Sequence, residues 1–178
     1  MRLFIAVNFD ENALAEIDSY QKDLKDCKIE GNYTPRENLH LTLAFIGEYS
    51  DPDEILDIME SIPFGEFSLK IEKIELFRDM YLARMTDHPM LQSYVRRLRR
   101  ALSDAGIPFD KKKFRPHITL VRRAQYPADA PVIEWEGADY EISVDSISLM
   151  RSQRGRNGMI YTELGSVYAD EFLTKKES

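Results

Sequence analysis

The order strand–helix–strand is expected twice in this chain, and this repeat limits the possible folds more than any other feature. An apolar stretch at Leu3–Val7 precedes a helix-like segment and then His40, and a stretch at Tyr81–Met85 precedes a second helix-like segment and then His117. Two similar strand–helix–strand halves predict an α+β fold with pseudo-twofold symmetry, in which two motif strands face a central groove. No stretch rich in Gly, Pro or Ser separates the halves, so we expect one bilobal domain over residues 1–178.

The two halves carry nearly identical motifs, His40–Leu43 and His117–Leu120, which both read His-x-Thr-Leu. Each motif lies in a run of apolar, β-prone residues, and side chains alternate between the faces of a strand. The histidine and threonine of each motif therefore share one face, and the apolar residues share the other. Two of the three histidines of the chain occupy this pattern.

Periodicity and helix-capping residues predict the remaining elements. Helices are expected at 11–26, 52–61 and 89–105, with Asp10 or Asn12 as the first cap and Gly106 ending the third helix. Strands are expected at 3–9, 39–46, 67–77, 80–85, 115–122, 132–135, 140–150 and 159–168. The segment 152–158 is expected to be a turn or mobile loop, and residues 175–178 a frayed tail.

The formal net charge is −7, which argues against a general nucleic-acid coat protein but leaves room for a locally basic pocket. Cys27 is the only cysteine, which excludes an intrachain disulfide and fits a reducing compartment. The apolar run at the N-terminus is too short for a secretory signal, and no later stretch is long enough to span a bilayer. We therefore expect a soluble cytoplasmic protein.

Two imidazoles and two hydroxyls in one cleft suit acid–base chemistry at a phosphodiester. Histidine titrates near neutral pH, so one ring can accept a proton from water while the other donates a proton to a leaving oxygen. The hydroxyls of Thr42 and Thr119 can donate to phosphate oxygens. Arg122 offers a guanidinium that matches phosphate in shape and charge. Simple alternation places Arg122 on the other face of the strand from His117, so a strand end or bulge is needed to bring its side chain to the face of His117. The chemistry implies neither a metal nor another cofactor.

The sequence resembles the 2H phosphoesterase superfamily, which is named for two His-x-Ser/Thr-hydrophobic motifs. More narrowly, it resembles the bacterial and archaeal RNA 2′,3′-cyclic phosphodiesterases, historically called 2′-5′ RNA ligases. The segments that carry the resemblance are residues 2–7, 38–47, 116–122 and 149–152, followed by Gly158 and Tyr161.

The resemblance implies a two-lobed fold with both motifs on central antiparallel strands, and metal-independent hydrolysis of RNA 2′,3′-cyclic phosphate ends to 2′-phosphate. It implies that His40 protonates the leaving 3′ oxygen and that His117 activates water, with the reverse assignment open because the halves are nearly symmetric. The residues expected to contact the substrate are Thr42, Thr119 and Arg122 at the phosphate and Phe45 at the terminal base. The expected partner is an RNA end or nucleotide carrying the cyclic phosphate, bound by a monomer with no obligate protein partner. Tyr33 departs from the family, where tryptophan is common.

Alternative interpretations remain at this point. Another cyclic or 2′-5′ phosphodiester would use the same histidines, whereas a nucleotide- or RNA-binding module without turnover would need neither of them to titrate. Thr42 and Thr119 also suit a strand for conformational reasons alone, and a strand phenylalanine such as Phe45 is often a core residue. The third histidine, His88, is expected to be exposed. The basic residues that could contact RNA are Arg96, Arg97, Arg99 and Arg100, Lys111–Lys113 with Arg115, and Arg151, Arg154 and Arg156.

Overall fold

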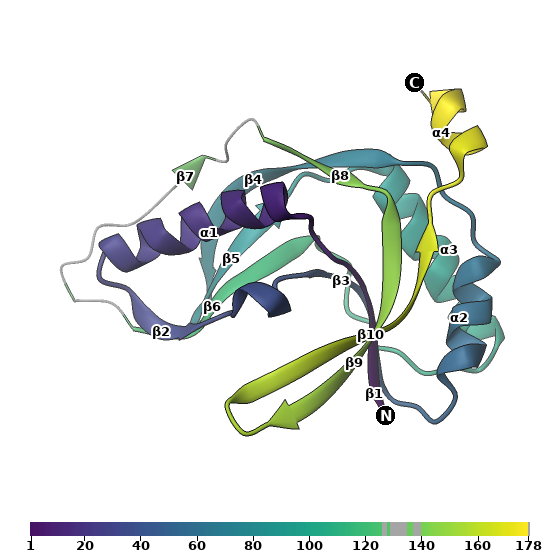
Figure 1. Cartoon of the computed structure of the whole chain (residues 1–178), viewed down its shortest axis with the longest axis horizontal. Coiled ribbons are helices and arrows are strands. Elements are labelled where there is room, and N and C mark those ends of the chain that lie inside the picture. Colours follow the sequence, from purple (N-terminus) through teal and green to yellow (C-terminus); the bar gives the residue numbers. More distant parts are fainter. Residues whose placement is uncertain (126–127, 129–134, 137–139, 178) are drawn as a thin grey trace.

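A computed structural model describes residues 1–125, 128, 135–136 and 140–177 (Figure 1). One antiparallel sheet runs through both halves of the chain in the order β10-β9-β1-β3-β6-β5-β4-β7, with β2 pairing to β6 and β8 to β4. The strands are β1 (Arg2–Val7), β2 (Glu30–Tyr33), β3 (Leu41–Glu48), β4 (Phe67–Phe77), β5 (Met80–Met85), β6 (His117–Gln125), β7 (Trp135–Glu136), β8 (Glu141–Val144), β9 (Ser146–Gly155) and β10 (Gly158–Tyr168).

The sheet confirms the α+β fold with two similar halves. In one half, β1 pairs with β3 on one side and β9 on the other, and in the other half β5 pairs with β6 and β4. A helix joins the two inner strands in each half. The helical elements are α1 (Glu11–Asp26), the short 3₁₀ helix η1 (Arg36–Asn38), α2 (Pro52–Glu60), α3 (Pro89–Asp104) and α4 (Glu171–Glu177).

The helices begin and end where capping chemistry predicts. The carboxylate of Asp10 accepts the Ala13 amide at 2.8 Å, and α2 begins at Pro52 after Asp51, which accepts the Glu54 amide. Helix α3 ends just before Gly106, whose φ of +71° is a left-handed conformation that glycine adopts at little cost.

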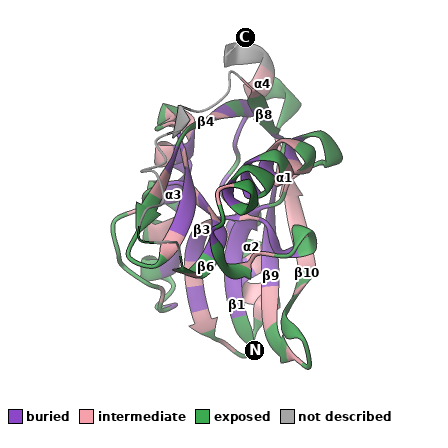
Figure 2. Ribbon diagram, turned by 90° about the vertical axis from the view of Figure 1, so that its left-hand side faces the viewer, coloured by how far each residue is buried: buried purple, intermediate pink, exposed green. Residues whose placement is uncertain are grey.

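One face of the sheet packs against the helices and forms the core. Residues Leu3, Ile5 and Val7 of β1 point into this core, where they meet the apolar stripes of α1, α2 and α3. The intervening residues Phe4 and Ala6 belong to a separate, smaller cluster on the opposite, open face of the sheet. Figure 2 shows that the buried residues concentrate in the strands, whereas the tip of the β9–β10 hairpin is exposed.

Both motif strands contain a β-bulge directly after the motif threonine. Thr42 and Ala44 pair with successive residues of β1, so β3 has one extra residue between them. Thr119 and Val121 pair with successive residues of β5, so β6 has the same irregularity. An extra residue inverts the later alternation of side chains. The residue five positions after each motif histidine therefore returns to the face of that histidine.

The structure corrects three expectations about local elements. The strand expected at 140–150 is two strands separated by Asp145, because β8 pairs with β4 whereas β9 pairs with β1. The segment 152–158 is mostly strand, since β9 and β10 continue their pairing as far as Gly155 and Gly158, and the expected turn is confined to residues 156–157. A frayed tail was expected at 175–178, but helix α4 extends through residues 175–177. Of the strand expected at 132–135, residues 132–134 lie outside the described residues.

Candidate active site

The two motifs meet where the halves of the sheet join. Strands β3 and β6 are antiparallel neighbours, and Leu41 pairs with Ile118. Extending this register by one residue in each direction places His40 opposite Thr119 and Thr42 opposite His117. Side chains of directly opposed residues lie on one face and close together. Each motif histidine therefore lies across from the threonine of the other motif.

The ring of His40 is fixed by two hydrogen bonds and two aromatic rings. Its Nδ1 lies 2.7 Å from the Asn38 carbonyl oxygen, which can only accept, so Nδ1 carries the proton. In the neutral ring Nε2 is then an acceptor, and Thr42 Oγ1 donates to it at 2.9 Å. The rings of Phe4 and Tyr161 lie with centroids 5.0 and 5.3 Å from the imidazole centroid. The neutral His40 ring is therefore held as the Nδ1–H tautomer, with Nε2 directed at Thr42.

His117 is oriented in the same way. Its Nδ1 donates to the Arg115 carbonyl oxygen at 2.8 Å, so its Nε2 is the nitrogen available for proton transfer. In the sheet His117 pairs with Arg84 of β5, and Arg84 forms an ion pair with Glu75 of β4. Both histidines thus use a backbone carbonyl two residues earlier to fix the same tautomer.

Arg122 lies on the face of His117 because of the bulge in β6. Its Nη1 donates a weak hydrogen bond to Met80 Sδ at 3.7 Å, which leaves most of the guanidinium available to a ligand. Strand β2 runs alongside this bulge, and Asn32 pairs with Arg122. Gly31 permits the approach, since a Cβ there would lie 2.8 Å from the Arg122 carbonyl oxygen.

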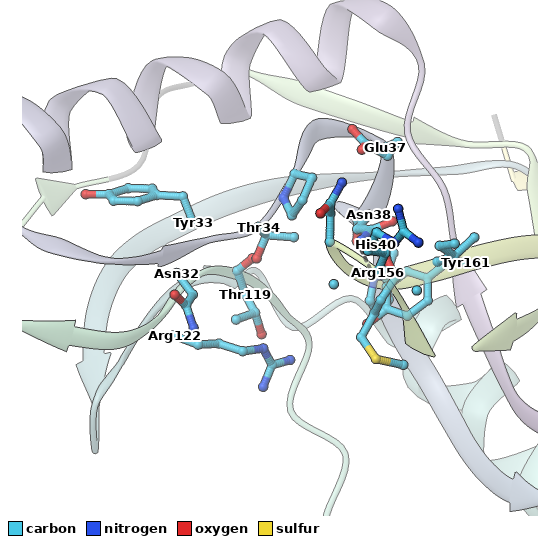
Figure 3. A pocket seen from close by; sticks show the side chains of 16 residues that line it. Asn32, Tyr33, Thr34, Glu37, Asn38, His40, Thr119, Arg122, Arg156 and Tyr161 are labelled. Carbon is cyan, nitrogen blue, oxygen red and sulfur yellow. Dashed lines mark hydrogen bonds between the residues drawn. The ribbon is translucent and has the colours of Figure 1, made fainter. Parts of the chain in front are cut away.

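A cavity of about 770 Å³, here called the His40 cavity, opens between the β2–η1 segment and the β9–β10 hairpin. Figure 3 shows Thr119 and Arg122 on one side of it and His40, Arg156 and Tyr161 on the other. Its remaining walls combine polar and apolar groups, contributed by Asn32, Tyr33, Thr34, Pro35, Glu37, Asn38, Gly155, Asn157, Gly158, Met159 and Ile160.

The structure brings four of the six predicted site residues directly to this cavity or to its histidine. His40, Thr119 and Arg122 line it, and Thr42 is hydrogen-bonded to His40. His117 does not line this cavity. It is the first residue of β6 and follows Arg115 and Pro116, which line a second cavity. Phe45 does not line it either. Its half-buried ring packs with the Phe4 cluster on the open face, and the Arg2 guanidinium carbon lies 5.0 Å from the ring centroid.

A comparison with known proteins supports the presence of two similar halves in the chain. The sequence pattern of the family described as LigT-like phosphoesterases matches residues 7–84 and 87–161, one segment in each half of the chain. The chain belongs to the LigT-like phosphoesterase family.

Relatives of this LigT-like phosphoesterase match over most of the chain. An RNA 2′,3′-cyclic phosphodiesterase from Thermotoga maritima is 29% identical, covering 92% of this chain and 93% of its own. The enzyme of the same name from Aeropyrum pernix is 33% identical over 75% of this chain and 83% of its own. Escherichia coli LigT has the same fold, with a TM-score of 0.78 at 24% identity over 94% of this chain and 96% of its own.

Burial and positive charge both disfavour protonation of the histidines in this LigT-like phosphoesterase. Burial lowers the pKa of His40, and the positive charges of Arg122 and His117 lower it further, against the opposing hydrogen bond to Asn38. Burial also lowers the pKa of His117, as do Arg84 and Arg122, whereas the hydrogen bond to Arg115 and the charge of Glu75 oppose the shift. Arg122 therefore acts electrostatically on both histidines.

Several residues that shape the site were not identified by sequence reasoning. Asn38 is buried and donates through Nδ2 to the Met159 carbonyl at 2.9 Å, which ties η1 to the β9–β10 hairpin. Gln21 of α1 donates through Nε2 to the carbonyls of Thr34 and Leu120, both at 3.0 Å. It thereby links α1 to the end of β2 and to β6. Asn38 lies in the segment 38–47 that carries the resemblance but was given no role, and Gln21 lies outside every such segment. Only the three-dimensional pairing reveals their roles.

The remaining candidates divide between the site and the scaffold. Arg156 lines the His40 cavity, whereas Arg151 and Arg154 do not. Tyr33 also lines it, with its hydroxyl donating to the Ile29 carbonyl at 2.6 Å. His88 is not fully exposed as expected, because its Nδ1 accepts the Met90 amide at 3.1 Å and caps α3.

Two absences concern only the described part of the chain. Within residues 1–125, 128, 135–136 and 140–177, no group of three or more His, Cys, Asp or Glu side chains is placed to hold a metal ion. No helix within these ranges is long and apolar enough to cross a membrane.

Proposed function

We propose that this LigT-like phosphoesterase hydrolyses RNA 2′,3′-cyclic phosphate ends to 2′-phosphate ends without a metal ion. The observation that carries the proposal is the reciprocal arrangement of the motifs, in which each histidine lies opposite the threonine of the other. Two titrating groups are needed for an acid–base reaction but not for binding alone. The names of the relatives from Thermotoga maritima and Aeropyrum pernix support this substrate class.

The reaction proceeds by displacement at phosphorus. His117 Nε2 accepts a proton from water as the water oxygen forms its bond to phosphorus. The bond between phosphorus and the 3′ oxygen breaks, and His40 donates its Nε2 proton to that oxygen. The product carries a 2′-phosphate and a free 3′-hydroxyl. Because both Nδ1 atoms donate to backbone carbonyls, both rings already present Nε2 for these transfers.

The phosphate-binding groups are Thr42, Thr119 and Arg122. Arg122 donates to the non-bridging oxygens as negative charge accumulates on them, and the threonine hydroxyls add further donors. The bound diester is an anion, and its charge offsets that of Arg122. Substrate binding therefore raises the pKa of His40, which Arg122 lowers in the free protein, and favours the protonated acid.

The His40 cavity receives the terminal nucleoside. Its walls combine the rings of Tyr33 and Tyr161 with the apolar side chains of Met159 and Ile160, which suits a base. Phe45 lies outside this cavity, in the Phe4 cluster that contacts His40, and offers a second surface on which the terminal base can stack. Purine and pyrimidine cyclic phosphates compared in parallel will establish the base preference.

The decisive experiment uses an RNA oligonucleotide ending in a 2′,3′-cyclic phosphate, in the presence of EDTA. Wild-type protein is expected to yield a 2′-phosphate end, and His40→Ala and His117→Ala are expected to lose at least about 10²-fold in rate. His88→Ala is the matched control, because His88 caps α3 away from the site. Activity that survives either motif substitution would contradict the paired-histidine mechanism, and a requirement for metal would contradict the metal-free one.

We also infer that the protein acts as a cytoplasmic monomer. The single cysteine, Cys27, fits a reducing compartment, and the proposed mechanism requires no residue from a second subunit. Light scattering on the purified protein tests the oligomeric state, and fractionation of the source cells tests the compartment.

A further inference from the structure

A second cavity, of about 540 Å³, lies next to His117 and is here called the Arg84 cavity. Arg84 lines it and is the sheet partner of His117, and Arg115 lines it and accepts the hydrogen bond from His117 Nδ1. Along the chain, the residues up to Pro116 line the Arg84 cavity, whereas Thr119 and Arg122 line the His40 cavity. His117 therefore lies, along the chain, between residues of the two cavities.

The Arg84 cavity is positively charged, although the protein as a whole carries a net charge of −7. Its cationic lining residues are Lys73, Arg84, Arg96, Arg99, Lys113 and Arg115, and its acidic lining residues are Glu72, Glu75 and Asp87. Cations thus outnumber carboxylates on its walls. Such a local excess attracts polyanions even when the net charge is negative.

Three of these cations already have partners within the protein. Arg84 is paired with Glu75, and Lys73 Nζ lies 3.4 Å from the same carboxylate. Arg99 donates to the carbonyls of Lys112 and Leu43, at 2.7 and 3.4 Å, and so supports the fold. These residues build the wall of the cavity and set its potential.

The other three cations are exposed. Arg96 extends from α3, and Lys113 and Arg115 come from the segment that leads into β6. No carboxylate of the described residues lies within 4.0 Å of their charged groups. They are free to pair with an external anion at little cost.

We propose that the Arg84 cavity binds the phosphate backbone of the RNA upstream of the reacting nucleotide, with Arg96 and Lys113 as its principal contacts. This inference rests on the proposed function. Such a substrate has two parts, a terminal nucleoside and an anionic phosphate backbone. The His40 cavity offers rings and apolar groups that suit the nucleoside, and the Arg84 cavity offers cations that suit the backbone. A 2′,3′-cyclic phosphate ends its strand, so all other phosphates lie on the upstream side.

The proposal predicts that the protein prefers an RNA chain ending in a cyclic phosphate over a cyclic mononucleotide. Wild-type protein is compared on adenosine 2′,3′-cyclic phosphate and on a six-nucleotide RNA ending in the same group, and kcat/KM is expected to be at least about 10-fold higher for the RNA. Raising the salt concentration is expected to lower kcat/KM more steeply for the RNA than for the mononucleotide. The slope of log(kcat/KM) against log[salt] is expected to be more negative by about 0.7 for each phosphate that the protein neutralises.

The double variant Arg96→Glu/Lys113→Glu tests the residues directly. It is expected to lower kcat/KM for the RNA at least about 10-fold, mainly through KM, and to leave the mononucleotide within about 2-fold of wild type. The matched control is Arg100→Glu/Lys112→Glu, which changes the net charge equally at exposed neighbours that do not line the cavity. This control is expected to retain the preference for RNA.

The outcomes separate the two levels of inference. Equal losses in both double variants, or hydrolysis of both substrates at one rate by the wild type, would overturn the backbone site and leave the proposed function intact. If wild-type protein hydrolyses neither substrate, the proposed function fails and the backbone site fails with it. A loss on the mononucleotide as large as that on the RNA would also overturn the site, because it would indicate damage to the catalytic centre.

Discussion

Phe45 and Arg122 occupy equivalent positions in the two halves of the molecule. Each follows its motif histidine by five residues and lies just beyond the bulge that brings it to the open face of the sheet. The histidines and threonines are therefore duplicated, whereas the next residue on that face is aromatic in one half and cationic in the other. In the proposed function, a symmetric pair of histidines is thus combined with an asymmetric surface, which we expect to give a bound nucleotide one preferred orientation.

The lowered histidine pKa values predict an acidic pH optimum. The proposed mechanism requires one histidine neutral and one protonated, so kcat/KM is expected to be maximal between the two pKa values of the free protein. Both lie below the usual value of about 6.5. We expect the maximum of kcat/KM below pH 6.5, with a decline toward higher pH as the general acid loses its proton. Initial rates between pH 4.5 and 8.5 measure this, and a maximum above pH 7 would contradict it.

Removing Arg122 is expected to change both the rate and the histidine titrations. Arg122→Ala removes a donor to the phosphate, so kcat/KM should fall about 10²-fold. It also removes a positive charge that disfavours protonation, so the pKa values of His40 and His117 should both rise. ¹H NMR titration of the imidazole protons measures the second effect without substrate.

Arg154→Ala is the control for this substitution. Arg154 is exposed and lies outside the lining of the His40 cavity. Its removal is expected to leave both titrations and the rate unchanged. Histidine pKa values that stay fixed in Arg122→Ala would mean that Arg122 does not act on the two rings.

The sequence was sufficient to predict the repeat and most elements, because these follow from local periodicity and capping. The meeting of the motif strands was expected from the repeat and from the family resemblance. The N-terminal cap of α1 is a local hydrogen bond to Asp10, one of the two residues expected to cap this helix, and Asp51 caps α2 in the same local way. By contrast, the break at Asp145 depends on which distant strands pair on either side of it. The roles of Asn38 and Gln21 depend on partners 121 and 99 residues away, which no local pattern reveals.

Phe45→Leu separates stacking on a base from packing in the Phe4 cluster. Leucine preserves apolar contact with Phe4 and Met150 but removes the aromatic face. If stacking contributes about 1 kcal/mol, KM for a terminal adenosine cyclic phosphate should rise about 5-fold while kcat and the melting temperature change little. A lower melting temperature with an unchanged KM would assign Phe45 to packing alone.

Asn38→Ala tests whether the β9–β10 hairpin forms a fixed wall of the His40 cavity. The substitution removes the hydrogen bond to the Met159 carbonyl but retains the Asn38 backbone oxygen that orients His40. We therefore expect a loss of about 1 kcal/mol in the free energy of unfolding and a several-fold rise in KM, with kcat within about 2-fold of wild type. Asn157→Ala is the matched control, because Asn157 also lines the cavity but is exposed at the hairpin turn. A fall in kcat at constant KM would instead show that the Asn38 side chain supports the catalytic histidine and not the wall.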